Sequence, residues 1–217
     1  MRFPSREEAG QELAVRLLEW ASSGDLANVT VLALPRGGVP VGAEIARVMA
    51  VPLDVLVVRK IGVPGAPEVG IGAIAGDDPP VFDRTGLRAL DLSEDELGAE
   101  VAQARAELHR REHVYRGGRP APDVRGHSVV VVDDGLATGI TARAALRHVR
   151  RGGPLRLTLA VPVCPPRTAA ALRDDADDVV ALHQPEQLRS VGEWYSDFHP
   201  VSDQEVLDAL RERHPAG

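Results

Sequence analysis

Residues 129–146, with the sequence VVVVDDGLATGITARAAL, constrain the fold of this chain more than any other stretch. The run of four valines is too short for a helix and lacks the alternation of a half-exposed strand. It predicts a strand buried on both faces of a parallel sheet. Asp133 and Asp134 follow where the strand would end. A helix is predicted next, because apolar residues recur at helical spacing: Ala142, Ala145, Leu146 and Val149.

The turn between this strand and helix has the features of a sugar-phosphate site. Ligands of open α/β sheets bind outside the carboxyl ends of the strands. Gly135 and Gly139 permit a tight turn with exposed amides, which attract a phosphate together with the helix start. Thr138 and Thr141 add hydroxyl donors. The two carboxylates can accept hydrogen bonds from the vicinal hydroxyls of a ribose.

The stretch resembles the phosphoribosyl-pyrophosphate (PRPP) motif of type I phosphoribosyltransferases, in which a hydrophobic strand, two acids and a T-G-x-T turn follow one another. A Walker B strand is the alternative, but its partner motif G-x-x-x-x-G-K-[ST] is absent from the sequence. No G-x-G-x-x-G fingerprint follows a strand either. The resemblance implies that ribose and 5-phosphate are bound by Asp133, Asp134, Gly135, Leu136, Ala137, Thr138, Gly139, Ile140 and Thr141.

A second glycine turn follows the predicted strand 29–34, in the sequence PRGGVP. Gly37 and Gly38 would let backbone amides face an anion, and Arg36 adds a fork of donors. Taken alone, an ordinary strand-to-helix turn explains these glycines as well. The family has a pyrophosphate-binding loop directly after the first core strand, so the resemblance implies that Arg36, Gly37 and Gly38 hold pyrophosphate.

Lys60 is the only lysine among 25 basic side chains. It follows Arg59 at the end of a predicted core strand, residues 53–58. The resemblance implies that Arg59 and Lys60 bind pyrophosphate, and that Lys60 is catalytic together with the acid pair. Residues 62–68 are rich in Gly and Pro and predict a mobile loop. In the family a loop at this place closes over the active site and excludes water.

The C-terminal part gathers aromatic side chains and acids in a chain with 3% aromatic residues. In related transferases the loop after the last core strand supplies an aromatic ring that stacks on the base and an acid near the metal. By this resemblance Trp194, Tyr195 and Phe198 would bind the acceptor, and Asp197 would contact the metal through water. A hydrophobic plug within the fold is the alternative.

Residues 76–122 carry less information. A short strand is expected at residues 87–92, and Ser93 with Glu96 predicts the start of a long helix. His109 and His113 are expected to be exposed histidines rather than metal ligands, because no third ligand is evident. Cys164 is the single cysteine, which excludes an internal disulfide, and we interpret it as a packed residue.

Strands alternate with helices, so the predicted fold class is α/β, with a mostly parallel open sheet flanked by helices. The length of 217 residues permits one domain, and the resemblance implies that this domain is phosphoribosyltransferase-like. Its core would span about 29–182, and a small hood would come from the terminal segments 1–28 and 183–217. The charge of −7 argues against nucleic-acid partners. No membrane span or signal peptide is evident, so a cytoplasmic location is expected.

The resemblance is strongest to bacterial predicted phosphoribosyltransferases whose acceptor is unassigned. It implies Mg²⁺-dependent transfer of the ribosyl 5-phosphate of PRPP to a small-molecule nitrogen acceptor, a nucleobase being the first candidate, with release of pyrophosphate. Relatives are commonly dimers, so a homodimer is expected. Two alternatives stay open: a non-catalytic regulator that senses PRPP or a nucleotide, and a Mg²⁺-dependent phosphosugar hydrolase.

Overall fold

Five parallel strands form the core of the protein, for which the computed structural model describes residues 2–21 and 28–213. Their order is β2–β1–β6–β7–β8, and every neighbouring pair is parallel. The strands are β1 (Val29–Ala33), β2 (Leu53–Val55), β6 (Ser128–Val132), β7 (Arg156–Val163) and β8 (Asp178–His183). The predicted α/β class with a mostly parallel sheet is confirmed.

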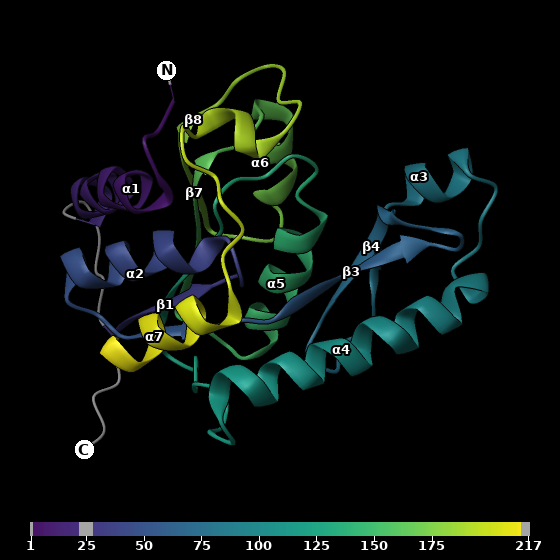
Figure 1. Ribbon diagram of the computed structural model, residues 1–217, viewed down its shortest axis with the longest axis horizontal. Coiled ribbons are helices and arrows are strands. Elements are labelled where there is room, and N and C mark those ends of the chain that lie inside the picture. The colour runs from purple at the N-terminus through teal and green to yellow at the C-terminus, as the bar shows by residue number, and fades with distance from the viewer. Residues whose placement is uncertain (1, 22–27, 214–217) are drawn as a thin grey trace.

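Helices cover both faces of this sheet (Figure 1). Val130 and Val132 of β6 belong to the hydrophobic cluster that includes side chains of α1 and α2, whereas Val129 and Val131 belong to the one that includes side chains of α5 and α6. All five residues of β6 are buried, which confirms the strand as predicted from its valines. The helices are α1 (Arg6–Ala21), α2 (Gly38–Met49), α5 (Ile140–Arg151) and α6 (Pro166–Leu172).

The helices α1 and α2 pack closely because α1 carries a glycine at the contact. A Cβ atom on Gly10 would lie 2.7 Å from the carbonyl oxygen of Val41. This close packing fixes the N-terminal helix against the core. It also brings Arg6, the first residue of α1, toward the carboxyl edge of the sheet, where the acids after β6 lie.

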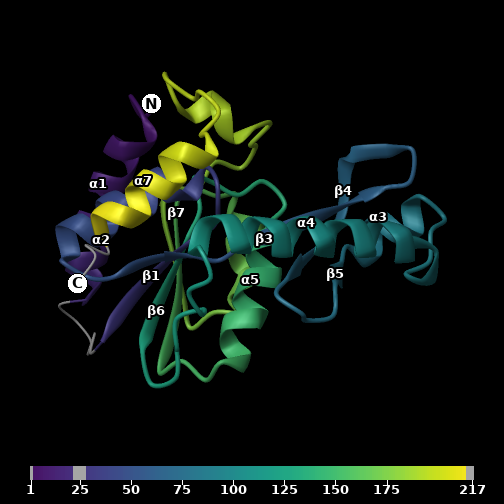
Figure 2. The same cartoon turned by 60° about the horizontal axis from the view of Figure 1, so that its bottom comes forward.

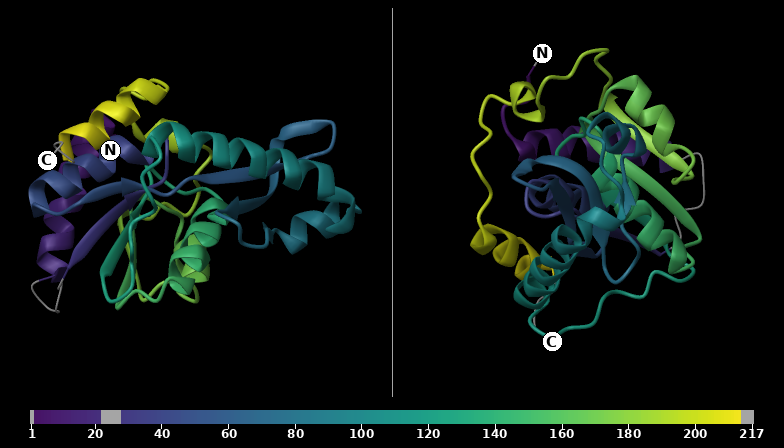
Figure 3. Two further views of the ribbon diagram at one scale, coloured as in Figure 1. Left: turned by 90° about the horizontal axis from the view of Figure 1, so that it is seen from below. Right: turned by 90° about the vertical axis from the view of Figure 1, so that its right-hand side faces the viewer.

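A second, smaller sheet forms an arm that extends away from the core (Figure 3). Its three strands are antiparallel, in the order β3–β4–β5. Figure 2 shows α4 running along the arm and back to the core. The arm consists of β3 (Val58–Val63), β4 (Ala66–Ala75), β5 (Val81–Phe82), α3 (Arg84–Ala89), a 3-10 helix (Asp95–Leu97) and α4 (Gly98–Arg116).

Two predictions for the start of the arm are wrong. The apolar run 53–58 is not one core strand, because β2 ends at Val55 and β3 begins a different sheet at Val58. Arg59 and Lys60 therefore lie within β3. The expected loop 62–68 is the β3–β4 hairpin, with a turn only at residues 64–65. Gly62 lies at a register shift of the strand pairing, and Gly65 occupies the turn with φ of 77°.

The strand expected at residues 87–92 is also wrong, since these residues include the end of helix α3. Asp83 caps that helix by accepting a hydrogen bond from the backbone N–H of Thr85 at 3.0 Å. The predicted helix start after Ser93 is confirmed, because the hydroxyl of Ser93 donates to Glu96 at 2.7 Å just before α4.

The two terminal segments meet beside the carboxyl edge of the sheet. Phe3 and Tyr195 form a β-bridge, and the N–H of Ser196 donates to the carbonyl of Phe3 at 2.8 Å. A 3-10 helix (Val191–Trp194) precedes this contact, and α7 (Asp203–Arg213) lies against α2 and α4. Residues 1, 22–27 and 214–217 of the predicted hood lie outside the described residues, and the core–hood division remains a prediction.

Cys164 is buried, and burial raises the pKa of its thiol to about 11, which confirms its interpretation as a packed residue. No helix in the described part of the chain is long and apolar enough to cross a membrane.

Candidate active site

A cleft of about 540 Å³ opens where the loops after β1 and β6 meet the base of the arm. Most of the predicted site residues line it. Asp133–Gly139 come from the loop after β6, Thr141 from the first turn of α5, Arg36 and Gly37 from the loop after β1, and Arg59 and Lys60 from β3. The structure thus brings together three segments that are far apart in the sequence. Gly38 and Ile140 border these segments without lining the cleft.

The two glycines after β1 allow this loop to lie directly against the acid pair. A Cβ atom on Gly37 would overlap Oδ2 of Asp134, and one on Gly38 would lie 2.7 Å from the carbonyl oxygen of Val132. The N–H of Leu34 donates to that same carbonyl at 2.8 Å. Glycine is therefore required here by close approach to the acids rather than by turn geometry alone.

The carboxylates of Asp133 and Asp134 each keep an edge in the cleft but are otherwise enclosed by protein. Burial is the main reason that the pKa of each lies above the ordinary value of an aspartate. The neighbouring charge of Asp134 raises the pKa of Asp133 further. The backbone N–H of Asp134 donates to Oδ1 of Asp133 at 2.9 Å. The site thus holds two interacting acids that resist being ionised together.

Arg6 provides the counter-charge for one of these acids, and nothing in the sequence pattern indicates it. Its Nε donates to Oδ2 of Asp134 at 2.8 Å, across 128 positions of the chain. The side chains are 7% and 14% exposed, so this is a nearly buried ion pair. Nη1 of Arg6 also donates to the carbonyl of His199 at 2.9 Å, and its guanidinium lies 3.8 Å from the ring centre of Phe198.

The turn after the acids supplies free donors at the start of α5. Gly139 occupies the N-cap position with φ of 76°, and no side chain caps the helix. The first amides of a helix without a side-chain cap favour an anion. Leu136 is buried, and its N–H donates to the carbonyl of Val163 at 2.9 Å. Its amide is therefore already used, whereas Thr138 is exposed in the cleft.

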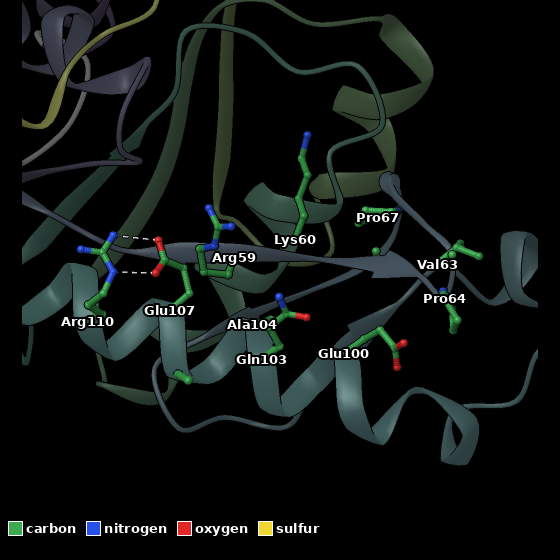
Figure 4. A pocket seen from close by; sticks show the side chains of 13 residues that line it. Arg59, Lys60, Val63, Pro64, Pro67, Glu100, Gln103, Ala104, Glu107 and Arg110 are labelled. Carbon is green, nitrogen blue, oxygen red and sulfur yellow. Dashed lines mark hydrogen bonds and ion pairs between the residues drawn. The ribbon is translucent and has the colours of Figure 1, made fainter.

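Lys60 and Arg59 lie between this cleft and a neighbouring cavity of about 780 Å³ on the side of α4. In Figure 4 the Lys60 side chain extends away from α4. Arg59 lies beside Glu107, which accepts a hydrogen bond from Arg110 at 2.6 Å. Burial lowers the pKa of Arg59, and its Nε has no hydrogen-bond partner among the described residues. Lys60 lines the same cleft as the two acids, and its charge lowers the pKa of both Asp133 and Asp134.

Arg36 lines the cleft, but its ion-pair partner Asp203 lies outside it. Its Nη1 lies 3.7 Å from Oδ1 of Asp203 at the start of α7, and the hydroxyl of Tyr115 donates to the same oxygen at 2.6 Å. Burial and this hydrogen bond raise the pKa of Tyr115 to about 12. The loop after β1 is thus connected to α7 and to the end of α4.

The predicted acceptor residues lie beside the cleft but do not line it. Tyr195 is 3% exposed, and its hydroxyl donates to the carbonyl of Asp134 at 2.6 Å. Its ring therefore has no free face in this structure. Trp194 is partly buried, with its ring 5.3 Å from that of His183. Phe198 is 37% exposed and stacks on Tyr195 with ring centres 5.2 Å apart.

The described residues contain no cluster of three or more His, Cys, Asp or Glu side chains that could hold a metal ion. His109 interacts with Asp77 and Glu112 and is 46% exposed, which agrees with the expectation of a surface histidine. Asp197 is 64% exposed, and hydrogen bonds from His199 lower its pKa, so it is a carboxylate. A cation that keeps most of its waters fits a single exposed carboxylate such as Asp197 better than a cation enclosed by protein ligands does.

Sequence comparison matches residues 6–197 to the family model described as "Phosphoribosyl transferase domain". Two proteins of Mycobacterium tuberculosis, from strains CDC 1551 and H37Rv, are each 41% identical over 212 residues, or 98% of this chain. Both are named "putative phosphoribosyl transferase". The matched part is 47% of each mycobacterial protein, so the chain spans about half the length of these relatives.

Structure comparison finds the same similarity. The crystal structure of TT1426 from Thermus thermophilus superposes with a TM-score of 0.79 at 41% identity, covering 98% of this chain and 99% of the other. AQ2163 from Aquifex aeolicus superposes with a TM-score of 0.53 at 12% identity, covering 94% and 84%. The second match supports the fold alone.

Proposed function

Because the chain belongs to the phosphoribosyl transferase family, we propose that it transfers the ribosyl 5-phosphate of PRPP to a nitrogen acceptor and releases pyrophosphate. One observation carries this proposal. The two glycine-bearing loops and the acid pair open into a single cleft of about 540 Å³. PRPP has a phosphate at one end, a diphosphate at the other and a diol between them, which matches this order of groups.

The 5-phosphate is assigned to the turn from Gly135 to Thr141. The uncapped start of α5 and the exposed hydroxyl of Thr138 supply donors for it. Leu136 would contribute to the shape of the turn only, because its N–H is already bonded. The ribose diol is assigned to Asp133 and Asp134, whose oxygens are acceptors for hydroxyl hydrogens.

The diphosphate is assigned to Arg36 and Gly37 on one side and to Arg59 and Lys60 on the other. Gly38 would contribute to the shape of the loop only, because it does not line the cleft and its N–H donates to the carbonyl of Leu34 at 3.0 Å. As the bond from the sugar C1 to the diphosphate oxygen lengthens, negative charge grows on the leaving group, and fixed cations stabilise it. The C1 atom becomes positive, next to the carboxylates. The acceptor nitrogen then bonds to C1, the bond from C1 to the diphosphate oxygen breaks with its electron pair on the departing pyrophosphate, and the proton of the nitrogen passes to solvent.

Mg²⁺ is proposed as the cofactor. When bound to the diphosphate it adds positive charge that stabilises the leaving group. Magnesium commonly retains several waters and uses substrate phosphates with one or two carboxylates, which suits a site where the described residues form no protein-only cluster. Asp197 does not line the cleft, so it would reach the cation only through water.

A nucleobase is the proposed acceptor. Phe198 offers a partly exposed ring next to Arg6, and Trp194 borders the same loop. Tyr195 has no free ring face, so we leave it out of the acceptor site and assign it to the support of Asp134. The homodimer and the cytoplasmic location remain predictions.

A screen for pyrophosphate release tests the proposal. The protein is incubated with PRPP, Mg²⁺ and single members of a panel of purines, pyrimidines and simple amines. Release that depends on one acceptor supports phosphoribosyl transfer. Binding of PRPP without release of pyrophosphate in the presence of any acceptor would favour a PRPP-sensing regulator. Release of inorganic phosphate from simple phosphosugars would favour a hydrolase.

A further inference from the structure

The ion pair between Arg6 and Asp134 joins the N-terminal helix to the candidate ribose site. Both side chains are nearly buried, and Nε of Arg6 lies 2.8 Å from Oδ2 of Asp134. A guanidinium in such a position is expensive to bury unless it is fully paired. Here it is paired, because Arg6 also donates to the carbonyl of His199 and lies over the ring of Phe198.

The geometry divides the two oxygens of Asp134 between different tasks. Oδ2 accepts from Arg6 and faces the backbone of Gly37. Oδ1 accepts no hydrogen bond from the side chain of any other described residue, and it belongs to a side chain that lines the cleft. This oxygen is therefore available to a ligand while the other is fixed.

The surroundings of Asp134 make this pairing necessary for its charge. The groups around it are Asp133, Arg6, Lys60 and Tyr195, whose hydroxyl donates to the carbonyl of Asp134. Burial raises the pKa of Asp134, and the positive charges of Arg6 and Lys60 lower it. Arg6 is the only one of these groups that donates a hydrogen bond to the carboxylate itself.

We propose that Arg6 is a positioning residue of the ribose site: it fixes Asp134 as a carboxylate whose free oxygen accepts a hydrogen bond from a ribose hydroxyl. The inference rests on the proposed function, since it concerns the same cleft. Arg6 does not line the cleft. It acts through Asp134, and it connects that acid to the loop that carries Phe198.

Binding of two probes separates this role from a merely structural one. Inorganic phosphate tests the turn after Asp134, and ribose 5-phosphate tests the turn plus the acids. The dissociation constant of inorganic phosphate divided by that of ribose 5-phosphate measures what the sugar hydroxyls contribute. In Arg6→Gln this ratio should fall by about 10- to 100-fold, as expected for loss of a hydrogen bond to a charged group. Affinity for inorganic phosphate should not change.

Arg16→Gln is the matched control, because it removes an arginine from the same helix. Arg16 pairs with Glu19 at the surface, where both side chains are 64% exposed. The ratio should keep its wild-type value in this variant. An equal loss of affinity for both probes in Arg6→Gln, or an unchanged ratio, would overturn the positioning role.

Arg6→Lys continues the test if Arg6→Gln fails to fold. Lysine keeps the charge but lacks the planar fork that reaches Asp134 and His199 together. In Arg6→Lys, a ratio below the wild-type value but still above that of a site with no gain from the ribose supports positioning by Arg6. The full wild-type ratio, or an equal loss of affinity for both probes, contradicts it. If the wild type binds phosphate but gains nothing from the ribose, the proposed function itself fails. If the wild type shows the gain and both Arg6 variants keep it, only the inference about Arg6 fails.

Discussion

Gly37 lies so close to Asp134 that a single methyl group on the glycine would overlap Oδ2 of the carboxylate. The two residues are on separate loops, after β1 and β6, and each loop is assigned to a different end of PRPP. The contact therefore fixes the distance between the candidate diphosphate and ribose sites. It also makes Gly37 a sensitive position for testing the site.

Gly37→Ala should displace the Asp134 carboxylate or the loop after β1. Overpacking of this kind typically costs about 1–3 kcal/mol of unfolding free energy. PRPP affinity should fall as well, which a titration calorimeter would measure. Gly98→Ala is the control, because nothing lies within 4 Å of a Cβ atom there. If Gly37→Ala kept both wild-type stability and PRPP affinity, the loops would be less tightly coupled than the structure indicates.

Lys60→Ala should lower turnover by about 10²- to 10³-fold, the usual cost of losing one donor that acts in the transition state. Stability should change little, because the Lys60 side chain is exposed. Lys60→Arg should restore only part of the activity, because a planar fork does not replace a compact ammonium. Steady-state pyrophosphate release measures all three proteins. A wild-type rate in Lys60→Ala would remove Lys60 from the catalytic residues.

Asp133→Asn should change how stability depends on pH. Burial and the charge of Asp134 raise the pKa of Asp133, so the folded protein binds this proton more tightly than the unfolded chain does. The resulting stability is complete below the ordinary pKa of about 3.9 and is lost as pH rises through the raised folded value. The free energy of unfolding of the variant, relative to that of the wild type, should therefore be higher at pH 8 than at pH 4. Urea denaturation at both pH values checks the sign, and a relative loss would contradict it.

Phe198→Ala should raise the Michaelis constant for the acceptor by about 2- to 10-fold, since ring stacking contributes ~0.5–1.5 kcal/mol. Its stability cost should be small, because the ring is 37% exposed. Trp194→Ala should cost more stability, because Trp194 packs against the cluster of Phe3 and Tyr195. The two variants are compared by urea denaturation and by kinetics with the acceptor found in the screen. An unchanged Michaelis constant for the acceptor in both variants would show that the acceptor binds elsewhere.

The sequence is informative where structure is local. The four valines of β6, the acids and the turn at Gly139 are contiguous, so their periodicity and composition determine what they form. The run 53–58 misleads because it is apolar throughout, and only packing separates β2 from β3. The hairpin at residues 62–68 has the composition of a loop, yet its backbone pairs across the arm.

The candidate site is predictable only in part for the same reason. Its glycines, acids and lysine belong to short motifs that the sequence displays. Arg6 lies 128 positions from Asp134, and a buried arginine at the start of an ordinary helix has no distinguishing pattern. The burial of Tyr195 likewise depends on Phe3, at the other end of the chain.

Thermal unfolding with and without PRPP tests most directly whether the turn after Asp134 binds the 5-phosphate. At about 100 times its dissociation constant, PRPP with Mg²⁺ should stabilise the wild type by ~2.7 kcal/mol, or roughly 5–10 °C in Tm. Thr138→Val with Gly139→Ala should lose most of that rise, each protein being compared with its own ligand-free form. The ligand-free variant should be somewhat less stable, because a Cβ atom on Gly139 would lie 2.8 Å from Cγ2 of Thr168. A full PRPP shift in the double variant, or no shift in the wild type, would contradict the assignment of this turn to the 5-phosphate.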